Sequence, residues 1–260
     1  MSIFNAAIFA LSLAVSGETK SQPIAVRYAE GVVNGFLTLR TTTGDLVAEG
    51  ALLQTARGNE VTSRLVFHFH DGSVHDETSV YTQRGRFRLL RSHLVQKGPT
   101  FPMTLDATFD ATRGSVTVRS KKGGDAEEVK TERMDLPPDL ANGLLFTLLK
   151  NVKPDTPGLV QHFLAFTPKP RVVKLEITPV GEESFLIGQA TLKSIHYRVH
   201  PELGGLTGLV APLIGKEPPD QHVWILYKDV PAFVKFEGTL FNGGPTWRIE
   251  LAGPRWPDVK

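Results

Sequence analysis

The 260-residue chain contains no cysteine. Disulfide bonds, thiolate metal sites, a cysteine nucleophile and a lipid-modified N-terminal cysteine are therefore excluded. The chain also lacks a charge bias, because 29 Lys and Arg residues stand against 27 Asp and Glu residues, giving a net charge of +2. Surfaces that bind nucleic acid are rich in basic residues, so this balance gives no electrostatic reason to expect a nucleic-acid partner.

Common catalytic motifs are missing as well. The sequence has no Gly-x-Ser-x-Gly nucleophile motif and no phosphate-binding glycine loop. Gly204, Gly205 and Gly208 do not match the dinucleotide fingerprint. Paired carboxylates, as at residues 127–128 and 182–183, fall in predicted turns, where solvated acidic side chains are the rule. No catalytic residue is predicted.

No segment reaches the eighteen apolar residues of a transmembrane helix. Residues 3–15 are nevertheless apolar except for Asn5 and Ser12, and small residues follow at a spacing typical of a cleavage site. We predict a signal peptide over residues 1–17, and a periplasmic or secreted bacterial protein without a transmembrane anchor after cleavage. No Lys or Arg precedes Lys20, which leaves a buried N-terminal strand or helix of a cytoplasmic protein as the alternative.

From residue 24 onward, short alternating segments are separated by turns about every ten residues, a spacing typical of antiparallel hairpins. We predict a mainly β fold with two antiparallel meanders, over residues 24–134 and 160–253. No linker divides the two halves, so the sequence favours a single domain over residues 24–253. In it the meanders form a strongly curved sheet or half-open barrel.

A helix is predicted between the meanders, over residues 138–151. Pro137 and Pro138 suit a helix start, and Asp139 adds a favourable negative charge to the first turn. The apolar residues recur at helical spacing: Leu140, Ala141, Leu144, Leu145, Leu148 and Leu149. A single apolar helix among strands must cover a sheet face or close a cavity, so we expect it to be a core plug or a cavity lid.

A second apolar segment, residues 206–214, has Leu206, Leu209 and Leu213 at helical spacing. Pro212 and the neighbouring glycines oppose a regular helix. This segment is interpreted either as a mobile lid over a hydrophobic cavity or as a short helix packed in the core.

Aromatic residues crowd the last three predicted strands and the region around the helix. Most are expected in the core, and some are expected to line a cavity suited to an acyl chain or isoprenoid. The predicted ligand-binding residues are Leu144, Leu145, Phe146, Leu148, Leu206, Leu209, Leu213, Trp224 and Phe233.

His68 and His70 lie two residues apart on a predicted strand, so both imidazoles point to the same side. Such a pair can hold zinc or another metal together with ligands from elsewhere, which spacing alone does not identify. His196 and His200 repeat the pattern. The alternative is a solvent-facing strand side that carries histidines, and no cofactor is predicted.

Four short motifs carry a family resemblance over most of residues 25–253: Asp71-Gly-Ser73, Leu136-Pro-Pro-Asp-Leu-Ala-Asn-Gly143, Ala211-Pro-Leu-Ile-Gly-Lys216 and Trp224-Ile-Leu-Tyr-Lys-Asp-Val-Pro-Ala-Phe-Val-Lys235. With them the chain resembles uncharacterised bacterial exported or periplasmic β-rich proteins of unknown function, of the DUF3108 kind. The resemblance implies a periplasmic β-rich protein and transfers no catalytic residue. In architecture the chain also looks like periplasmic lipoprotein carriers, an analogy that does not fix function.

Three functions are therefore expected from the sequence. The first is non-enzymatic binding or carriage of a hydrophobic, lipid-like molecule by an exported envelope protein. The second is a metal-dependent enzyme that uses His68 and His70. The third is a structural partner in an envelope complex that pairs through exposed edge strands.

Overall fold

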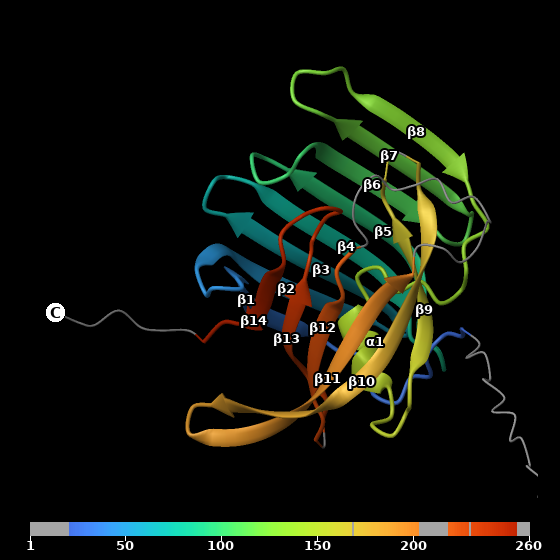
Figure 1. The fold of residues 1–260 in the computed structure, drawn as a ribbon. Helices are drawn as coiled ribbons and strands as arrows, with labels where there is room; N and C mark the ends of the chain where they lie inside the picture. The colour runs from blue at the N-terminus through green and yellow to red at the C-terminus, as the bar shows by residue number, and fades with distance from the viewer. Residues whose placement is uncertain (1–20, 168, 203–217, 229, 254–260) are drawn as a thin grey trace, which may run out of the picture.

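The structure is a computed structural model that describes residues 21–167, 169–202, 218–228 and 230–253. This part of the chain forms fourteen strands and one short helix (Figure 1). The strands of the first meander are β1 (Val33–Thr41), β2 (Leu46–Arg57), β3 (Glu60–Phe69), β4 (Val74–Thr82), β5 (Arg88–Lys97), β6 (Thr104–Asp110), β7 (Ser115–Lys121) and β8 (Glu128–Arg133). After the helix α1 (Leu145–Asn151), the second meander contains β9 (Leu159–Ala165), β10 (Arg171–Ile187), β11 (Ala190–Glu202), β12 (Gln221–Leu226), β13 (Ala232–Gly238) and β14 (Trp247–Leu251).

All fourteen strands belong to a single antiparallel sheet. Its order is β8-β7-β6-β5-β4-β3-β2-β1-β14-β13-β12-β11-β10-β9. The first and last strands of the chain are thus neighbours at the centre, with Leu37 opposite Leu251. The sheet curves so that the two meanders face each other, and it is not closed, because β8 and β9 are its two edges (Figure 1). The predicted mainly β fold with one strongly curved sheet is confirmed.

Alternating side chains give this sheet a buried inner face, which faces the other meander and α1, and an outer face. In β6, for example, Leu105, Ala107 and Phe109 are buried while the residues between them are not. Successive side chains of a strand point to opposite faces, so this alternation places every second residue in the core. The largest fully buried side chains come from both meanders and the helix, and include Leu39, Phe67, Tyr81, Phe87, Leu148, Tyr197 and Ile225.

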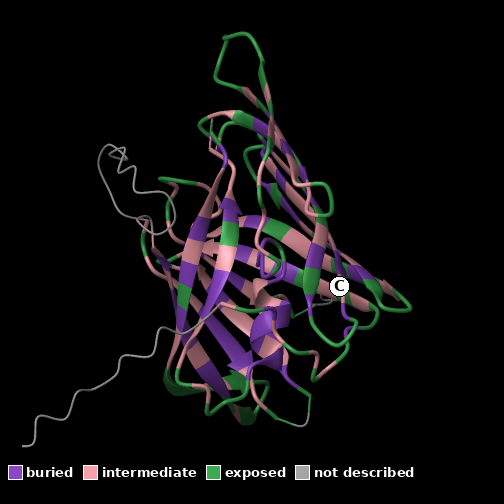
Figure 2. Cartoon of the chain, turned by 90° about the vertical axis from the view of Figure 1, so that its right-hand side faces the viewer, coloured by how far each residue is buried: buried purple, intermediate pink, exposed green. Residues whose placement is uncertain are grey.

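The helix α1 lies inside the curve of the sheet (Figures 1 and 2). Leu144, just before it, and Leu148 and Leu149 within it are at most 2% exposed. Burying each leucine stabilises the fold by about 1.5–3 kcal/mol relative to an exposed side chain. The one helix in the described ranges is not of a length and hydropathy that would cross a membrane.

The helix is shorter than the predicted span of residues 138–151, because it begins only at Leu145. Gly143 has a φ of +62°, in the left-handed region, which a regular α-helix does not use. A side chain at this glycine would also clash with Ser79 of β4, so the backbone approaches the sheet closely here. Asp139 therefore lies outside the helix, and the first turn contains no acidic residue.

Asn142 fixes the segment that leads into α1. Its Oδ1 accepts a hydrogen bond from the backbone N–H of Leu164 at 2.8 Å, and its Nδ2 donates to the Leu164 carbonyl at 2.9 Å. The fully buried amide thus completes the hydrogen bonds of an edge residue of β9 as a neighbouring strand would. Backbone bonds between Ala141 and His162 and between His162 and Asp139 continue this pairing.

The other end of α1 is held by charged and amide side chains. Lys150 forms a 2.6 Å ion pair with Glu30, a residue whose other carboxylate oxygen accepts a hydrogen bond from Gln54 on β2 at 3.0 Å. Asn151 Oδ1 accepts hydrogen bonds from the backbone N–H groups of Arg27 and Tyr28. The helix is therefore tied both to the sheet and to the segment that precedes β1.

The two edge strands of the sheet are protected in different ways. Residues 139–142 cover the edge of β9 through the bonds described above. β8 carries charged or polar side chains at every position except Val129, and Lys130 pairs with Glu128 at 2.7 Å. Charged residues on an edge strand oppose pairing with another chain. The charges on β8 therefore disfavour the addition of a strand from a partner at this edge.

We predict that Asn142→Ala lowers the free energy of unfolding by about 2–4 kcal/mol, because a buried N–H and a buried carbonyl of Leu164 lose their partner. Urea unfolding followed by circular dichroism measures this change. Asn242→Ala, at an exposed turn position, is the matched control and should change stability by less than about 0.5 kcal/mol. Equal effects of the two substitutions would contradict an anchoring role for Asn142.

Candidate ligand-binding cavity

A cavity of about 290 Å³ lies between the inner faces of the two meanders. It is lined mainly by apolar side chains, including Leu52, Leu65, Leu94, Leu105, Val173, Leu175, Phe236 and Ile249. Residues 141–143, which lead into α1, and residues 145 and 146 at its start form another part of its wall. A water molecule needs about 10–15 Å³ on this measure, so the space is roughly twenty times larger than one water site.

Two of the predicted ligand-binding residues, Leu145 and Phe146, line this cavity. Phe146 also stacks on Phe233 of β13, with ring centroids 4.3 Å apart. Leu144 and Leu148 are instead packed among core residues. The helix thus packs in the core, as the predicted core plug would, and its first two residues also form part of the cavity wall.

Trp224, the next predicted ligand-binding residue, lies away from the cavity. Its strand neighbours Val223 and Ile225 belong to the core, so Trp224 points to the outer face. There its ring is stacked on His196 with centroids 4.2 Å apart, and the ammonium of Lys235 lies 3.7 Å from the ring centroid. The indole N–H donates to Glu183 at 2.8 Å, which explains how this aromatic residue is buried without contributing to the inner core.

The remaining predicted ligand residues, Leu206, Leu209 and Leu213, lie outside the described residues, as does the predicted signal peptide over residues 1–17. Pro201 and Pro218, which precede and follow residues 203–217 in the sequence, line the cavity.

The apolar cavity carries one polar wall, formed by strand β4. His75, Glu77 and Ser79 all line it, because every second residue of a strand points to the same face. Sequence reasoning missed this row, because it started the strand at residue 78 and left His75 between that strand and the Asp71-Gly72 turn. The strand begins at Val74. The alternation of His75, Glu77, Ser79 and Tyr81 was the available signal.

His75 is 3% exposed, and its burial lowers the pKa of the imidazole to about 4. The ring is therefore neutral at neutral pH. Its Nδ1 lies 3.1 Å from Nε2 of Gln96 on β5, whereas its Nε2 has no partner in the described part of the chain. A buried nitrogen without a partner is costly, so this atom is a candidate for ligand contact.

Glu77 lies between Leu65 of β3 and Leu94 of β5. Its side chain is half-buried and lines the cavity. Burial raises the pKa of this carboxyl to about 7. Within the described residues it forms no ion pair that would favour the charged form, and a group titrating near neutral pH in a cavity is a mark of a functional site.

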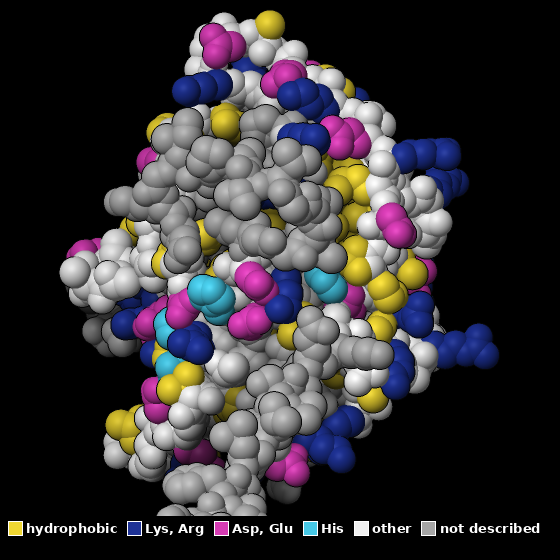
Figure 3. Space-filling view, turned by 45° about the vertical axis from the view of Figure 1, so that its right-hand side comes forward, with side chains coloured by type: hydrophobic (Ala, Val, Ile, Leu, Met, Phe, Trp, Pro, Cys, Tyr) yellow, Lys and Arg dark blue, Asp and Glu magenta, His cyan; other side chains and the backbone are white. Residues whose placement is uncertain are grey.

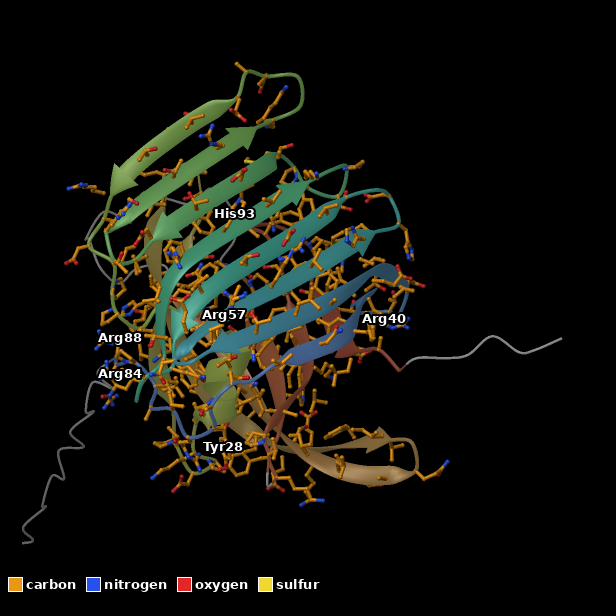
Figure 4. All side chains as sticks on the ribbon, turned by 180° about the vertical axis from the view of Figure 1, so that it is seen from behind. Tyr28, Arg40, Arg57, Arg84, Arg88 and His93 are labelled. Atoms are coloured by element: carbon orange, nitrogen blue, oxygen red, sulfur yellow. The ribbon has the colours of Figure 1, made fainter. Side chains whose placement is uncertain are left out.

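His68 and His70, the predicted metal ligands, are both exposed on the outer face, as their spacing predicts. His70 Nε2 lies 3.1 Å from a carboxylate oxygen of Glu49. On the same face, shown in Figure 4, His93 of β5 pairs with Asp106 at 3.0 Å. Across the described ranges, no three His, Asp or Glu side chains are grouped as metal ligands would be. The geometry therefore gives this pair no third ligand.

His196 and His200, the second predicted pair, likewise bind different partners. His196 contacts His222 at 2.8 Å, and His200 contacts Asp220 at 2.7 Å. Figure 3 shows histidines beside side chains of both charges, without a large patch of a single sign on that face.

Ser21, His162 and Asp139 come together near the start of the described chain, a combination that resembles a nucleophile triad. Asp139 contacts Nδ1 of His162 at 2.9 Å, and Ser21 Oγ lies 3.2 Å from that same nitrogen. In a working triad the serine and the carboxylate contact opposite ring nitrogens. This arrangement is therefore a hydrogen-bonded anchor of the N-terminal segment rather than an activated serine.

Comparison with known proteins adds a single structural likeness to this description. Neither the family models nor the curated proteins gave a match to the sequence. A solved structure that matches is a beta-barrel-like protein of a domain of unknown function, DUF1849, from Brucella abortus. It is 9% identical with a TM-score of 0.45, over 86% of this chain and 98% of that chain.

A specific relation to DUF3108 proteins stays a prediction. The fold assigned above follows from the strands and their pairing alone.

We predict that Glu77→Gln stabilises the protein at pH 8 but not at pH 4. The folded pKa of about 7 lies above the ordinary value of 4.5, so the carboxyl costs stability as the pH rises from about 4.5 to about 7. The amide variant should gain at most about 3 kcal/mol at pH 8, as measured by urea unfolding. Glu49→Gln on the exposed outer face is the control. A pH-independent effect of Glu77→Gln would show that the carboxyl titrates normally.

Proposed function

We propose that this chain is an exported envelope protein that binds or carries a hydrophobic, lipid-like molecule in the cavity between its meanders. The observation that carries this proposal is the largely apolar space of about 290 Å³ beside Leu145 and Phe146. Binding sites for small molecules are mostly apolar cavities with a few polar groups that orient the ligand, and this cavity matches that description.

The composition of the walls supports an elongated apolar ligand. Residues from eleven strands contribute to the lining, so the space extends from one meander to the other. Seven leucine and five phenylalanine residues line it, whereas the ionisable residues in the described part of the lining are His75 and Glu77 on β4 and Arg171 on β10. An acyl or isoprenoid chain would bury its surface against these walls at a gain of about 25 cal/mol per Å².

We include export in the proposal because residues 1–17 have the composition of a signal peptide. A protein that carries a lipid-like molecule through an aqueous compartment must shield its apolar chain from water, and an internal cavity does this.

Organic extraction of the purified full-length protein, followed by lipid mass spectrometry, tests the proposal. We expect an apolar ligand to copurify with the wild-type chain. Leu145→Trp should reduce the bound amount several-fold, because the indole would occupy the cavity that Leu145 lines.

Leu53→Trp is the matched control, since Leu53 lies on the outer face and is 38% exposed. It should retain the ligand at the wild-type level. Equal lipid content in wild type, Leu145→Trp and Leu53→Trp would contradict binding in this cavity, provided that circular dichroism shows all three to be folded.

A further inference from the structure

The hydrogen bonds that β4 can offer to a ligand in the cavity depend on which ring nitrogen of His75 carries the proton. Nε2 of Gln96 lies 2.7 Å from the carbonyl oxygen of Leu240 and 3.1 Å from Nδ1 of His75. A carbonyl only accepts hydrogen bonds, so the Gln96 atom that faces it must be the amide nitrogen. This nitrogen also donates to Nδ1 of His75, and the neutral ring therefore carries its proton on Nε2.

His75 thus presents one N–H donor that finds no acceptor in the described chain. Two positions further along β4, Glu77 presents a carboxyl between two leucines. A Cβ added at Gly143, just before α1, would lie 3.2 Å from Glu77 Oε1. The glycine therefore keeps a side chain from crowding this carboxyl oxygen. A donor and an acceptor therefore lie two residues apart on one face of β4, in a cavity lined mainly by apolar side chains.

The spacing of the two groups suits one small polar atom. Residues two apart on a strand are about 7 Å apart, and hydrogen bonds join heavy atoms at roughly 3 Å. An oxygen placed between them can accept from His75 and donate to Glu77. A hydroxyl is the simplest group that does both.

We propose that His75 and Glu77 bind the terminal hydroxyl of a long-chain alcohol whose chain lies in the apolar part of the cavity. This inference rests on the proposed function and names its ligand class. His75 Nε2–H donates to the hydroxyl oxygen, and the hydroxyl donates its proton to a carboxyl oxygen of Glu77. No bond is made or broken.

Charged end groups fit this wall less well. A carboxylate would face the carboxyl of Glu77, and an ammonium would face the N–H of His75. Both charges would also be transferred from water to a largely apolar space, at a high cost in free energy. Arg171 on β10 is the basic side chain of the lining, and its buried Nε has no partner among the described residues. An anionic end group at Arg171 is therefore the competing chemistry that an experiment must distinguish.

Displacement of a neutral apolar fluorescent dye from the full-length protein at pH 7 measures these preferences. The competitors are decanol, decyl methyl ether, decanoate and decylamine, which share the chain and differ at its end. We expect decanol to bind about tenfold tighter than the ether, which accepts a hydrogen bond but has no proton to donate.

Glu77→Leu should weaken decanol binding about tenfold, to the level of the ether, when both are measured against the dye affinity of the same variant. Glu77→Gln keeps a carbonyl acceptor and should retain most of the preference, which guards against a variant that fails to fold. Glu49→Leu, on the outer face, is the matched control and should change nothing.

Each alternative outcome has a distinct meaning. Dye binding with no preference among the four competitors, or a preference that survives Glu77→Leu, overturns the hydroxyl site and leaves the apolar cavity standing. Tightest binding of decanoate, lost in Arg171→Leu, overturns it in favour of an anionic ligand. No dye binding by the wild type, or equal binding by Leu145→Trp, overturns the proposed function and this inference with it.

Discussion

The pairing of β1 with β14 is the constraint on which the rest of the structure depends. It places the first and last strands of the chain at the centre of one sheet, so that each meander grows outward from them. The chain must then pass from β8 at one edge to β9 at the other. Hairpins cannot make this connection, and the passage runs across the inner face. The central helix is a consequence of this topology.

A crossing segment inside a β-sheet carries backbone groups that need partners. Here residues 139–142 take the place of a further strand beside β9, and Asn142 supplies both a donor and an acceptor from its side chain. Gly143 then lets the backbone lie against Ser79, and α1 begins immediately after it. These contacts cover one edge of the sheet, fill part of its interior with leucine and leave the adjoining space lined by both meanders.

Strands and turns were predictable because their signals are local. Alternation and turn residues gave most strand positions to within a few residues, and an apolar 3.6-residue period gave the helix. The predicted helix start was wrong because it depends on long-range contacts that no local pattern reveals. Gly143 lies against β4, and Asn142 is hydrogen-bonded to β9. Proline at 137 and 138 is as compatible with an extended crossover as with a helix start.

The candidate site was predicted only in part for the same reason. The apolar spacing around the helix singled out Leu145 and Phe146, which line the cavity, and their contact with a ligand stays a prediction. Trp224 was assigned to the cavity by its aromatic character, although strand alternation turns it outward beside His196 and Lys235. His68 and His70 drew attention as a motif, whereas His75 has no motif and gains its character from burial and from Gln96.

Two glutamates, Glu30 and Glu77, differ in whether other side chains of the protein stabilise their carboxyl groups. Glu30 is buried with Lys150 and Gln54 as partners, which satisfy its carboxylate and tie α1 to the sheet. Glu77 lies between leucines with no such partner among the described residues, and burial raises its pKa to about 7. A leucine in its place would continue the apolar wall and remove the desolvation cost. Stability therefore favours replacing Glu77 and keeping Glu30, and the ligand that we propose for the cavity would supply the missing partner.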